Sequence, residues 1–210
     1  MYSKIQYISQ GVTSADQIDA ISSVLDGGCT WIQLRFKNTS AAIFLQTALK
    51  VKSLCEQYNA TLIINDNVEL AKEIDACGVH LGLTDTSIKN ARKILGETKI
   101  IGGTANTLQH VLQRIDEKCN YIGLGPFRFT STKEKLSPIL GIEGYQHVMN
   151  SLKSKGIEIP IFAIGGIKVE DVNDILKTGI YGVALSGTLT HIKNPKEIIT
   201  QLNKNIYASA

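Results

Sequence analysis

The polar residues whose side chains could bind ligands or take part in catalysis follow short apolar runs, at places where the strands of a parallel sheet would end. Gln33, Arg35 and Lys37 alternate with Leu34 and Phe36 directly after one such run. Because successive side chains of an extended segment point to opposite faces, the three polar side chains share one face. An arginine can hold a phosphate through two hydrogen bonds, and a lysine adds a mobile positive charge. The segment predicts an anion site, and a solvated strand end is the alternative.

Two carboxylates follow the next two apolar runs. Asp66 stands between Asn65 and Asn67, and Asp85 comes three residues after Gly82. One or two carboxylates beside substrate phosphates are the usual protein ligands of Mg²⁺. An aspartate between a strand and a helix also commonly caps that helix. Each aspartate alone leaves both interpretations open, and the neighbouring cationic segment favours the metal.

Glycines and hydroxyl groups follow the later apolar runs. Gly165–Gly166 and Ser186–Gly187 come after the seventh and eighth runs, where (β/α)8 barrels usually bind phosphate. The long segment Gly125–Gly141 carries three hydroxyls and a lysine at Thr130–Lys133, which suit a phosphate and a departing anion. Structural glycine turns and a solvated loop are the alternatives. Two anion sites predict two phosphorylated ligands, or one ligand with a phosphate at each end.

Eight short apolar runs must position these residues. They are Ile5–Ser9, Trp31–Leu34, Thr61–Ile64, Gly78–Leu81, Ile100–Gly102, Tyr121–Gly123, Pro160–Ala163 and Gly182–Leu185. Segments with helical spacing separate them, and Ser14 with Gln17 predicts a capping box at the start of the first one. The alternation predicts βαβ units and a parallel sheet. The number of runs favours closure as a (β/α)8 TIM barrel over an open sheet, and no G-x-G-x-x-G follows the first run. We expect one catalytic domain over residues 1–210, since no linker divides the chain.

Composition narrows the classes of function. A net charge of +3 without a dense basic run argues against nucleic acid as a partner. No apolar run approaches the ~20 residues that cross a bilayer, and the N-terminus lacks a secretory signal, so we expect a cytoplasmic protein without a membrane partner. The four cysteines have no zinc-ligand spacing, and we expect them to be reduced and mostly buried. The sequence is compatible with a homo-oligomer and does not establish one.

Over nearly its whole length, the sequence resembles the thiamine-phosphate synthase (thiamine-phosphate pyrophosphorylase) family. The matching segments occur in the family's order and at nearly its spacing. They are Ile32–Lys37, Ile63–Asp66, Gly78–Gly82 with Asp85, Ile101–Gly102, Gly125–Pro126, Thr130–Lys133, Ala163–Ile167 and the turn at Ser186. The resemblance implies a Mg²⁺-dependent transferase that joins an aminopyrimidine methyl pyrophosphate to a thiazole phosphate, plain or carboxylated, giving thiamine phosphate and pyrophosphate. In this reaction pyrophosphate leaves first, and the thiazole nitrogen captures the pyrimidine cation.

The resemblance also implies roles for individual residues. Arg35, Lys37 and Lys133 are the expected catalytic residues, and Asp66 and Asp85 the expected Mg²⁺ ligands. The residues expected to bind the pyrimidine pyrophosphate are Gln33, Leu34, Arg35, Phe36, Lys37, Asn65, Thr104 and Lys133. Those expected to bind the thiazole phosphate are Thr130, Ser131, Thr132, Gly166, Leu185 and Ser186.

The chain departs from the family pattern at several positions. Leu83 stands where glutamine is frequent, Asn106 where histidine is frequent, and Phe127–Phe129 where Ile-Phe-Pro is common. These departures concern the fine geometry of the pocket and leave the cationic and acidic positions in place. Two alternatives remain at this point, a related thiazole tautomerase and a protein that only binds thiamine precursors. The retained Arg35, Lys37, Asp66, Asp85 and Lys133 argue against the tautomerase, and the two retained carboxylates also argue against the binding protein.

Overall fold

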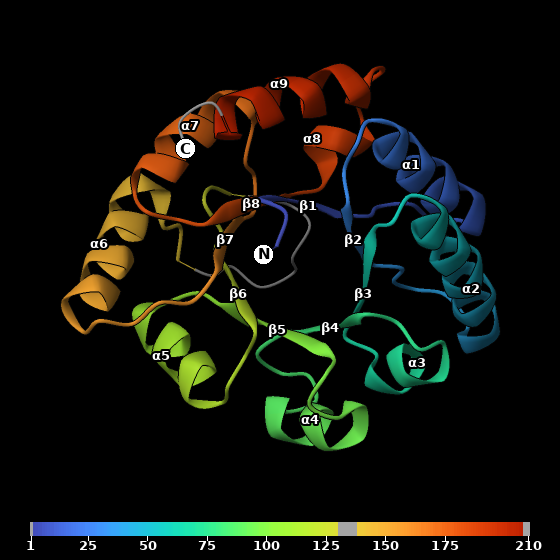
Figure 1. The fold of residues 1–210 in the computed structure, drawn as a ribbon, viewed down its shortest axis with the longest axis horizontal. Coiled ribbons are helices and arrows are strands. Elements are labelled where there is room, and N and C mark those ends of the chain that lie inside the picture. Colours follow the sequence, from blue (N-terminus) through green and yellow to red (C-terminus); the bar gives the residue numbers. More distant parts are fainter. Residues whose placement is uncertain (1, 130–137, 208–210) are drawn as a thin grey trace.

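A closed barrel of parallel strands forms the centre of the molecule (Figure 1). The computed structural model describes residues 2–129 and 138–207. The strands are β1 (Ile5–Ile8), β2 (Trp31–Leu34), β3 (Thr61–Asn65), β4 (Gly78–Leu81), β5 (Ile100–Ala105), β6 (Tyr121–Leu124), β7 (Ile161–Ile164) and β8 (Gly182–Leu185). Each strand pairs with the next, and β1 pairs with β8 to close the sheet. The predicted (β/α)8 barrel is therefore confirmed.

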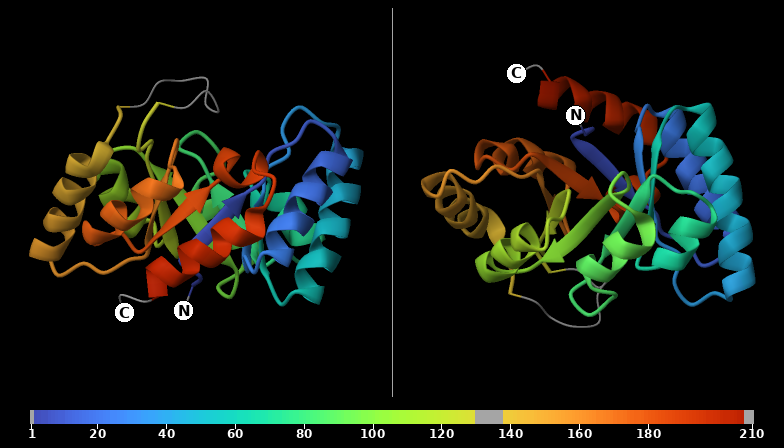
Figure 2. Two further views of the ribbon diagram at one scale, coloured as in Figure 1. Left: turned by 90° about the horizontal axis from the view of Figure 1, so that it is seen from above. Right: turned by 60° about the horizontal axis from the view of Figure 1, so that its bottom comes forward.

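Helices surround the barrel and cover its outer face (Figure 1). They are α1 (Ser14–Asp26), α2 (Ala41–Gln57), α3 (Val68–Glu73), α4 (Ile88–Leu95), α5 (Leu108–Asp116), α6 (Gly141–Ser154), α7 (Val172–Lys177), α8 (Gly187–Thr190) and α9 (Pro195–Tyr207), with the short 3₁₀ helix η1 (Val169–Asp171) before α7. Figure 2 shows the N-terminus and the end of α9 at one end of the barrel, and the loops after β2 and β6 at the other. The second end is the one at which all eight strands finish, and it carries the candidate site.

Side-chain alternation along the strands divides the apolar residues into two clusters. The larger cluster fills the space between strands and helices and includes Leu34 and Leu185. The smaller one lies inside the barrel and consists of Trp31, Ile63, Tyr121, Phe162 and Ala184. Its aromatic rings meet edge to face, with the Trp31 centroid 5.1 Å from those of both Tyr121 and Phe162. The interior is therefore a packed floor beneath the site rather than a channel.

Strand β5 is longer than the apolar run predicted. It extends to Ala105, so Thr104 belongs to the strand. The predicted end at Gly102 was wrong because Gly102 and Gly103 contribute no hydrophobic signal. They are glycine for a packing reason: a Cβ on Gly102 would lie 2.2 Å from Cζ of Tyr121, and one on Gly103 would lie 2.8 Å from Cδ of Arg114.

The first helix is capped one residue earlier than predicted. Thr13 is the N-cap: its hydroxyl accepts from the Asp16 amide at 3.1 Å, and the Asp16 carboxylate accepts from the Thr13 amide at 2.8 Å. Ser14 instead accepts from the Thr47 hydroxyl at 2.7 Å. The Gln17 side chain donates to the carbonyl of Arg35 at 3.2 Å, which ties α1 to the segment after β2.

The remaining physical expectations concern cysteines and membranes. Cys29, Cys55 and Cys119 are buried free thiols, as predicted, whereas Cys77 is exposed. Burial raises the pKa of Cys29 to about 11, so this thiol stays protonated at neutral pH. Among the helices of the described residues, none combines the length and the hydropathy that a bilayer crossing requires.

Candidate active site

A cavity of about 360 Å³ opens at the carboxyl end of the strands. Residues of all eight strands or of the turns after them line it, because parallel strands all finish at this end. The sequence-predicted residues that it brings together are Gln33, Arg35, Asn65, Thr104, Gly166 and Ser186. We call this space the central cavity.

The central cavity also contains residues that the sequence did not single out. They are Ile8, Gln10, His80, Pro126, Ile164, Ala184, Thr188 and His191, whereas Gly165 and Gly187, which also line it, belong to the predicted glycine turns. A signal existed for His80: it alternates with the buried Val79 and Leu81 along β4, so it had to face the barrel interior. No comparable pattern marked Gln10, which follows β1 in a loop, or His191, which follows the short helix α8.

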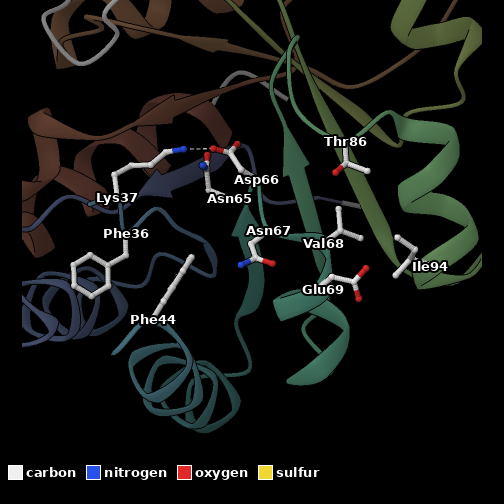
Figure 3. Close-up of a pocket in the computed structure, with 10 residues that line it drawn as sticks. All are labelled: Phe36, Lys37, Phe44, Asn65, Asp66, Asn67, Val68, Glu69, Thr86 and Ile94. Carbon is white, nitrogen blue, oxygen red and sulfur yellow. Dashed lines mark hydrogen bonds and ion pairs between the residues drawn. The ribbon is translucent and has the colours of Figure 1, made fainter. Parts of the chain in front are cut away.

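A second cavity of about 400 Å³ adjoins the first and contains Lys37, Asp66 and Thr86 (Figure 3). Asn65 lines both cavities, so the two spaces meet at the end of β3. Figure 3 shows the Lys37 ammonium group and the Asp66 carboxylate pointing at each other, and these two groups form an ion pair. The structure therefore places Gln33 and Arg35 in one cavity and Lys37 beside it, at the acidic residues.

The two predicted metal carboxylates lie close enough for Asp85 to affect the ionisation of Asp66. Burial raises the pKa of Asp66, the hydrogen bond with Asp85 raises it further, and Lys37 opposes both effects. The Asp85 carboxylate also accepts from the Gly82 amide at 2.6 Å. Neither aspartate caps the helix that follows it, because Asn67 caps α3 and Ser87 caps α4. Capping is thus excluded as the reason for these two residues.

A paired set of carboxylates is suited to a divalent cation. Asp85 disfavours the charged form of Asp66, and a cation placed beside the two carboxylates would offset this effect. In the described part of the chain, no three His, Cys, Asp or Glu side chains form a group that could hold a metal. A cation here would therefore take its remaining ligands from water or from substrate oxygens. That donor set is the one Mg²⁺ commonly uses with phosphorylated substrates.

The glycine turn after β7, which contains Gly165 and Gly166, forms another wall of the central cavity. Gly165 and Gly166 have φ values of +90° and +70°, a backbone conformation that favours glycine. A Cβ on Gly166 would also lie 2.5 Å from Cγ of Arg128. Arg128 holds this turn by donating its amide to the Gly165 carbonyl and a guanidinium N–H to the Gly166 carbonyl, both at 3.1 Å. The turn is therefore a fixed wall with exposed backbone.

Other predicted site residues contact the cavities less directly or not at all. Leu34 and Leu185 are buried in the cluster between strands and helices, and neither lines a cavity described above. Phe36 lines the second cavity and packs edge to face on Phe44. The side chain of Ser186 donates to the Ile8 carbonyl at 2.6 Å. Thr130, Ser131, Thr132 and Lys133 lie outside the described residues.

The departures from the family pattern have structural consequences. Asn106 is buried, and its side-chain amide donates to the Gly125 carbonyl, which ties β5 to the start of the loop after β6. Phe127 stacks on Tyr145 with ring planes 14° apart. Leu83 is 40% exposed at the mouth of the barrel. Asn106 and Phe127 thus fix loop roots, whereas Leu83 presents an apolar side chain to solvent.

Comparison with known proteins identifies relatives over nearly the full chain. The family model described as thiamine monophosphate synthase matches residues 6–189. A thiamine-phosphate synthase of Flavobacterium psychrophilum is 60% identical over 98% of this chain and 100% of its own length. One from Flavobacterium johnsoniae is 54% identical over 100% of this chain and 99% of its own length. A solved structure of thiamine phosphate pyrophosphorylase from Pyrococcus furiosus superposes with a TM-score of 0.85 at 26% identity, covering 98% of this chain and 96% of that one.

Proposed function

This chain belongs to the thiamine monophosphate synthase family, and from that premise we propose how its barrel carries out the condensation. The chain is a transferase of thiamine biosynthesis that forms thiamine phosphate. Its substrates are an aminopyrimidine methyl pyrophosphate and a thiazole phosphate, the latter plain or carboxylated. The whole chain acts as one catalytic domain.

One observation supports our assignment of the cavity that binds the pyrophosphate group. Lys37, Asp66 and Asp85 are gathered at the end of β2 to β4, and Asn65 joins them to the central cavity that holds Arg35. A pyrophosphate carries several negative charges, and this is where cationic groups and a cation-binding pair occur side by side. We therefore assign the second cavity to the pyrophosphate and the central cavity to the pyrimidine ring.

With the plain thiazole phosphate the reaction breaks one bond and forms one, whereas the carboxylated form must in addition lose its carboxylate as CO₂. The bond between the pyrimidine methylene carbon and the pyrophosphate oxygen breaks, and both of its electrons leave with pyrophosphate. The ring nitrogen of the thiazole then donates its lone pair to the methylene carbon, which gives the thiazolium product. Since no proton is transferred in these two steps, the site needs charge stabilisation and positioning rather than a general base.

We assign charge stabilisation, metal binding and substrate positioning to different residues. Arg35 and Lys37 stabilise the charge that grows on the departing pyrophosphate, and Lys133 is proposed to join them. Asp66 and Asp85 would hold Mg²⁺, which when bound neutralises phosphate charge. Gln33, Asn65 and Thr104 hold the pyrimidine. Any contribution of Leu34 is made by its main chain, because the side chain is buried away from the cavity.

We assign the thiazole phosphate to the wall formed by the turns after β7 and β8. Gly166 offers exposed backbone there, Ser186 lines the same cavity, and Leu185 directly precedes Ser186 at the end of β8, so we assign its contribution to the main chain. Thr130, Ser131 and Thr132 are proposed to complete this site. The two phosphorylated ligands then approach the central cavity from opposite sides, which brings the thiazole nitrogen towards the pyrimidine methylene.

A reconstituted assay tests the proposal. Purified protein is mixed with both phosphorylated substrates and Mg²⁺, and thiamine phosphate and pyrophosphate are quantified by chromatography. We expect the two products in equal amounts and none when either substrate is omitted. A folded protein that gives neither product would refute the proposal, and conversion of the thiazole alone into its isomer would identify a tautomerase.

A further inference from the structure

A line of hydrogen-bonded side chains forms part of the floor of the central cavity and continues beneath it. Gln33 donates to the Gln6 side-chain oxygen at 3.2 Å, and the Gln6 amide nitrogen donates to the Tyr121 hydroxyl at 3.3 Å. That hydroxyl contacts Nδ1 of His80 at 3.0 Å, and Nε2 of His80 contacts the Thr104 hydroxyl at 3.0 Å. We call these five residues the relay.

Each relay residue comes from a different strand and points into the barrel. Gln33, His80 and Thr104 line the central cavity, whereas Gln6 and Tyr121 are 1% and 0% exposed beneath it. The position of the Tyr121 ring is specific. Gly102 is the register partner of Tyr121, and only its missing side chain leaves room for the phenol ring. The fold therefore builds a space for this ring beside His80.

The hydrogen bonds of the relay run in one direction from donor to acceptor. Because the Gln6 amide nitrogen donates to the Tyr121 oxygen, the Tyr121 proton is available for Nδ1 of His80. Burial raises the pKa of Tyr121, so the phenol keeps that proton at neutral pH. An imidazole that accepts at Nδ1 carries its own proton on Nε2 and donates it to the Thr104 oxygen. The Thr104 hydroxyl proton is then left to point into the cavity, and the Gln33 carbonyl oxygen faces the cavity at the other end.

We propose that Tyr121 is a positioning residue that orients the relay, so that Gln33 presents an acceptor and Thr104 a donor to the pyrimidine ring. This inference rests on the proposed function for the identity of the ligand. A 4-aminopyrimidine offers the complementary pair, an amino N–H donor next to a ring nitrogen acceptor. A 4-oxopyrimidine offers the reverse pair, an oxygen acceptor next to a ring N–H donor. The oriented relay therefore selects the amino form and rejects the oxo form.

Nuclear magnetic resonance of the ligand-free protein tests the orientation. Nitrogen-15 spectra of histidine side chains distinguish the Nε2–H form from the Nδ1–H form, and separate replacements of His110, His147 and His191 assign the His80 signals. We expect wild-type His80 to carry a proton on Nε2 and to be hydrogen-bonded as an acceptor at Nδ1. Detection of the Nδ1–H form would overturn the proposal. This measurement needs neither substrate nor a variant of the relay.

Kinetics with paired substrates test the recognition. The ratio of kcat/KM for the 4-amino pyrophosphate over its 4-oxo analogue is measured for wild type and for Tyr121→Phe. We expect the ratio to fall about five- to tenfold, because the buried hydrogen bond that orients the relay is lost. The Nδ1 signal of His80 should shift as its partner is lost. Tyr145→Phe is the matched control: it removes a buried hydroxyl that donates to the Leu124 carbonyl outside the relay, and should leave both readouts unchanged.

A second variant keeps the recognition test decisive if Tyr121→Phe does not fold. Gln6→Leu releases the amide of Gln33 at the opposite end of the relay, and we expect the same loss of amino-over-oxo selectivity. An unchanged ratio in a folded variant would overturn the recognition, even if the nitrogen-15 spectra support the orientation. If wild type makes no thiamine phosphate, the proposed function fails, and the spectra of the ligand-free protein still decide whether the relay is oriented as described.

Discussion

The guanidinium of Arg128 binds both carboxylate oxygens of Asp171, with N–O distances of 2.6 and 2.9 Å. Arg128 lies just after β6, and Asp171 ends the 3₁₀ helix after β7. The same guanidinium donates to the Gly166 carbonyl at 3.1 Å. This contact fastens the root of the β6 loop to the turn that we assign to the thiazole phosphate.

We first predict that loosening this contact weakens binding of the thiazole phosphate. Arg128→Lys keeps the charge but cannot hold the carboxylate with two parallel hydrogen bonds, so the Gly166 turn is held less firmly. The KM for the thiazole phosphate should rise about five- to tenfold, with a smaller change for the pyrimidine substrate. Steady-state kinetics with each substrate varied in turn measure both effects. Lys177→Ala removes an exposed ion pair with Asp174 as the control, and an equal rise in both KM values would contradict the assignment.

The second prediction concerns acid stability. Burial alone would raise the pKa of Asp171, but the hydrogen bonds from Arg128 and from the Lys168 amide outweigh it and lower the pKa. A carboxyl whose pKa is lower in the folded state stabilises the protein above its unfolded pKa of about 3.9, and this contribution disappears as pH falls through the folded pKa. Asp171→Asn should therefore reduce Tm at pH 7, and the difference from wild type should shrink below about pH 4. Melting curves between pH 3 and 7 measure this, and a constant difference would count against it.

A third prediction tests the cation. Asp66→Asn removes one carboxylate of the pair, and we expect the Mg²⁺ concentration for half-maximal activity to rise at least tenfold, since even indirect partners of a metal typically contribute that much to affinity. Turnover should fall by orders of magnitude at low Mg²⁺ without loss of the folded state, and a chelator should abolish wild-type activity. Asp75→Asn, which removes an exposed partner of Lys99, is the control. A near-normal Mg²⁺ titration for Asp66→Asn would remove the role we assign.

The fourth prediction concerns Arg114, a buried arginine behind the site. It donates to the Thr104 carbonyl at 3.1 Å and to the Gly82 carbonyl at 2.9 Å, and it pairs with Glu117. Arg114→Met leaves both carbonyls without this donor and should lower the free energy of unfolding by about 3 kcal/mol. Denaturant unfolding measures the loss. A change below about 1 kcal/mol would show that water or a rearranged loop replaces these hydrogen bonds.

The sequence predicts the barrel because apolar runs and helical stripes are local signals. Three strands, β2, β4 and β8, have the predicted limits. The pattern fails where local hydrophobicity is a poor guide: at β5, Gly102 and Gly103 belong to the strand but lack side chains. It also misplaces the first helix cap by one residue, since Thr13 and Ser14 both carry a hydroxyl and only the backbone conformation decides between them.

The candidate site also has features that the sequence predicts and features that only the tertiary structure shows. The residue types that follow the strands indicate anions and a cation, because the topology of a parallel barrel brings all strand ends to one face. The clearest of these residues are Gln33, Arg35, Lys37, Asp66 and Asp85. The chain alone could not separate metal binding from helix capping. The positions of Asn67 and Ser87 at the helix starts exclude helix capping, and metal binding by Asp66 and Asp85 stays a prediction.

What the sequence by itself determined is therefore the order of the elements and the chemistry offered at their ends. Tertiary structure alone decided which side chains touch. Arg128 meets Asp171 across 43 residues, and Gln6 meets Tyr121 across 115. No local pattern encodes such pairs, because they depend on how far each strand is shifted against its neighbours and on how the barrel closes between β1 and β8.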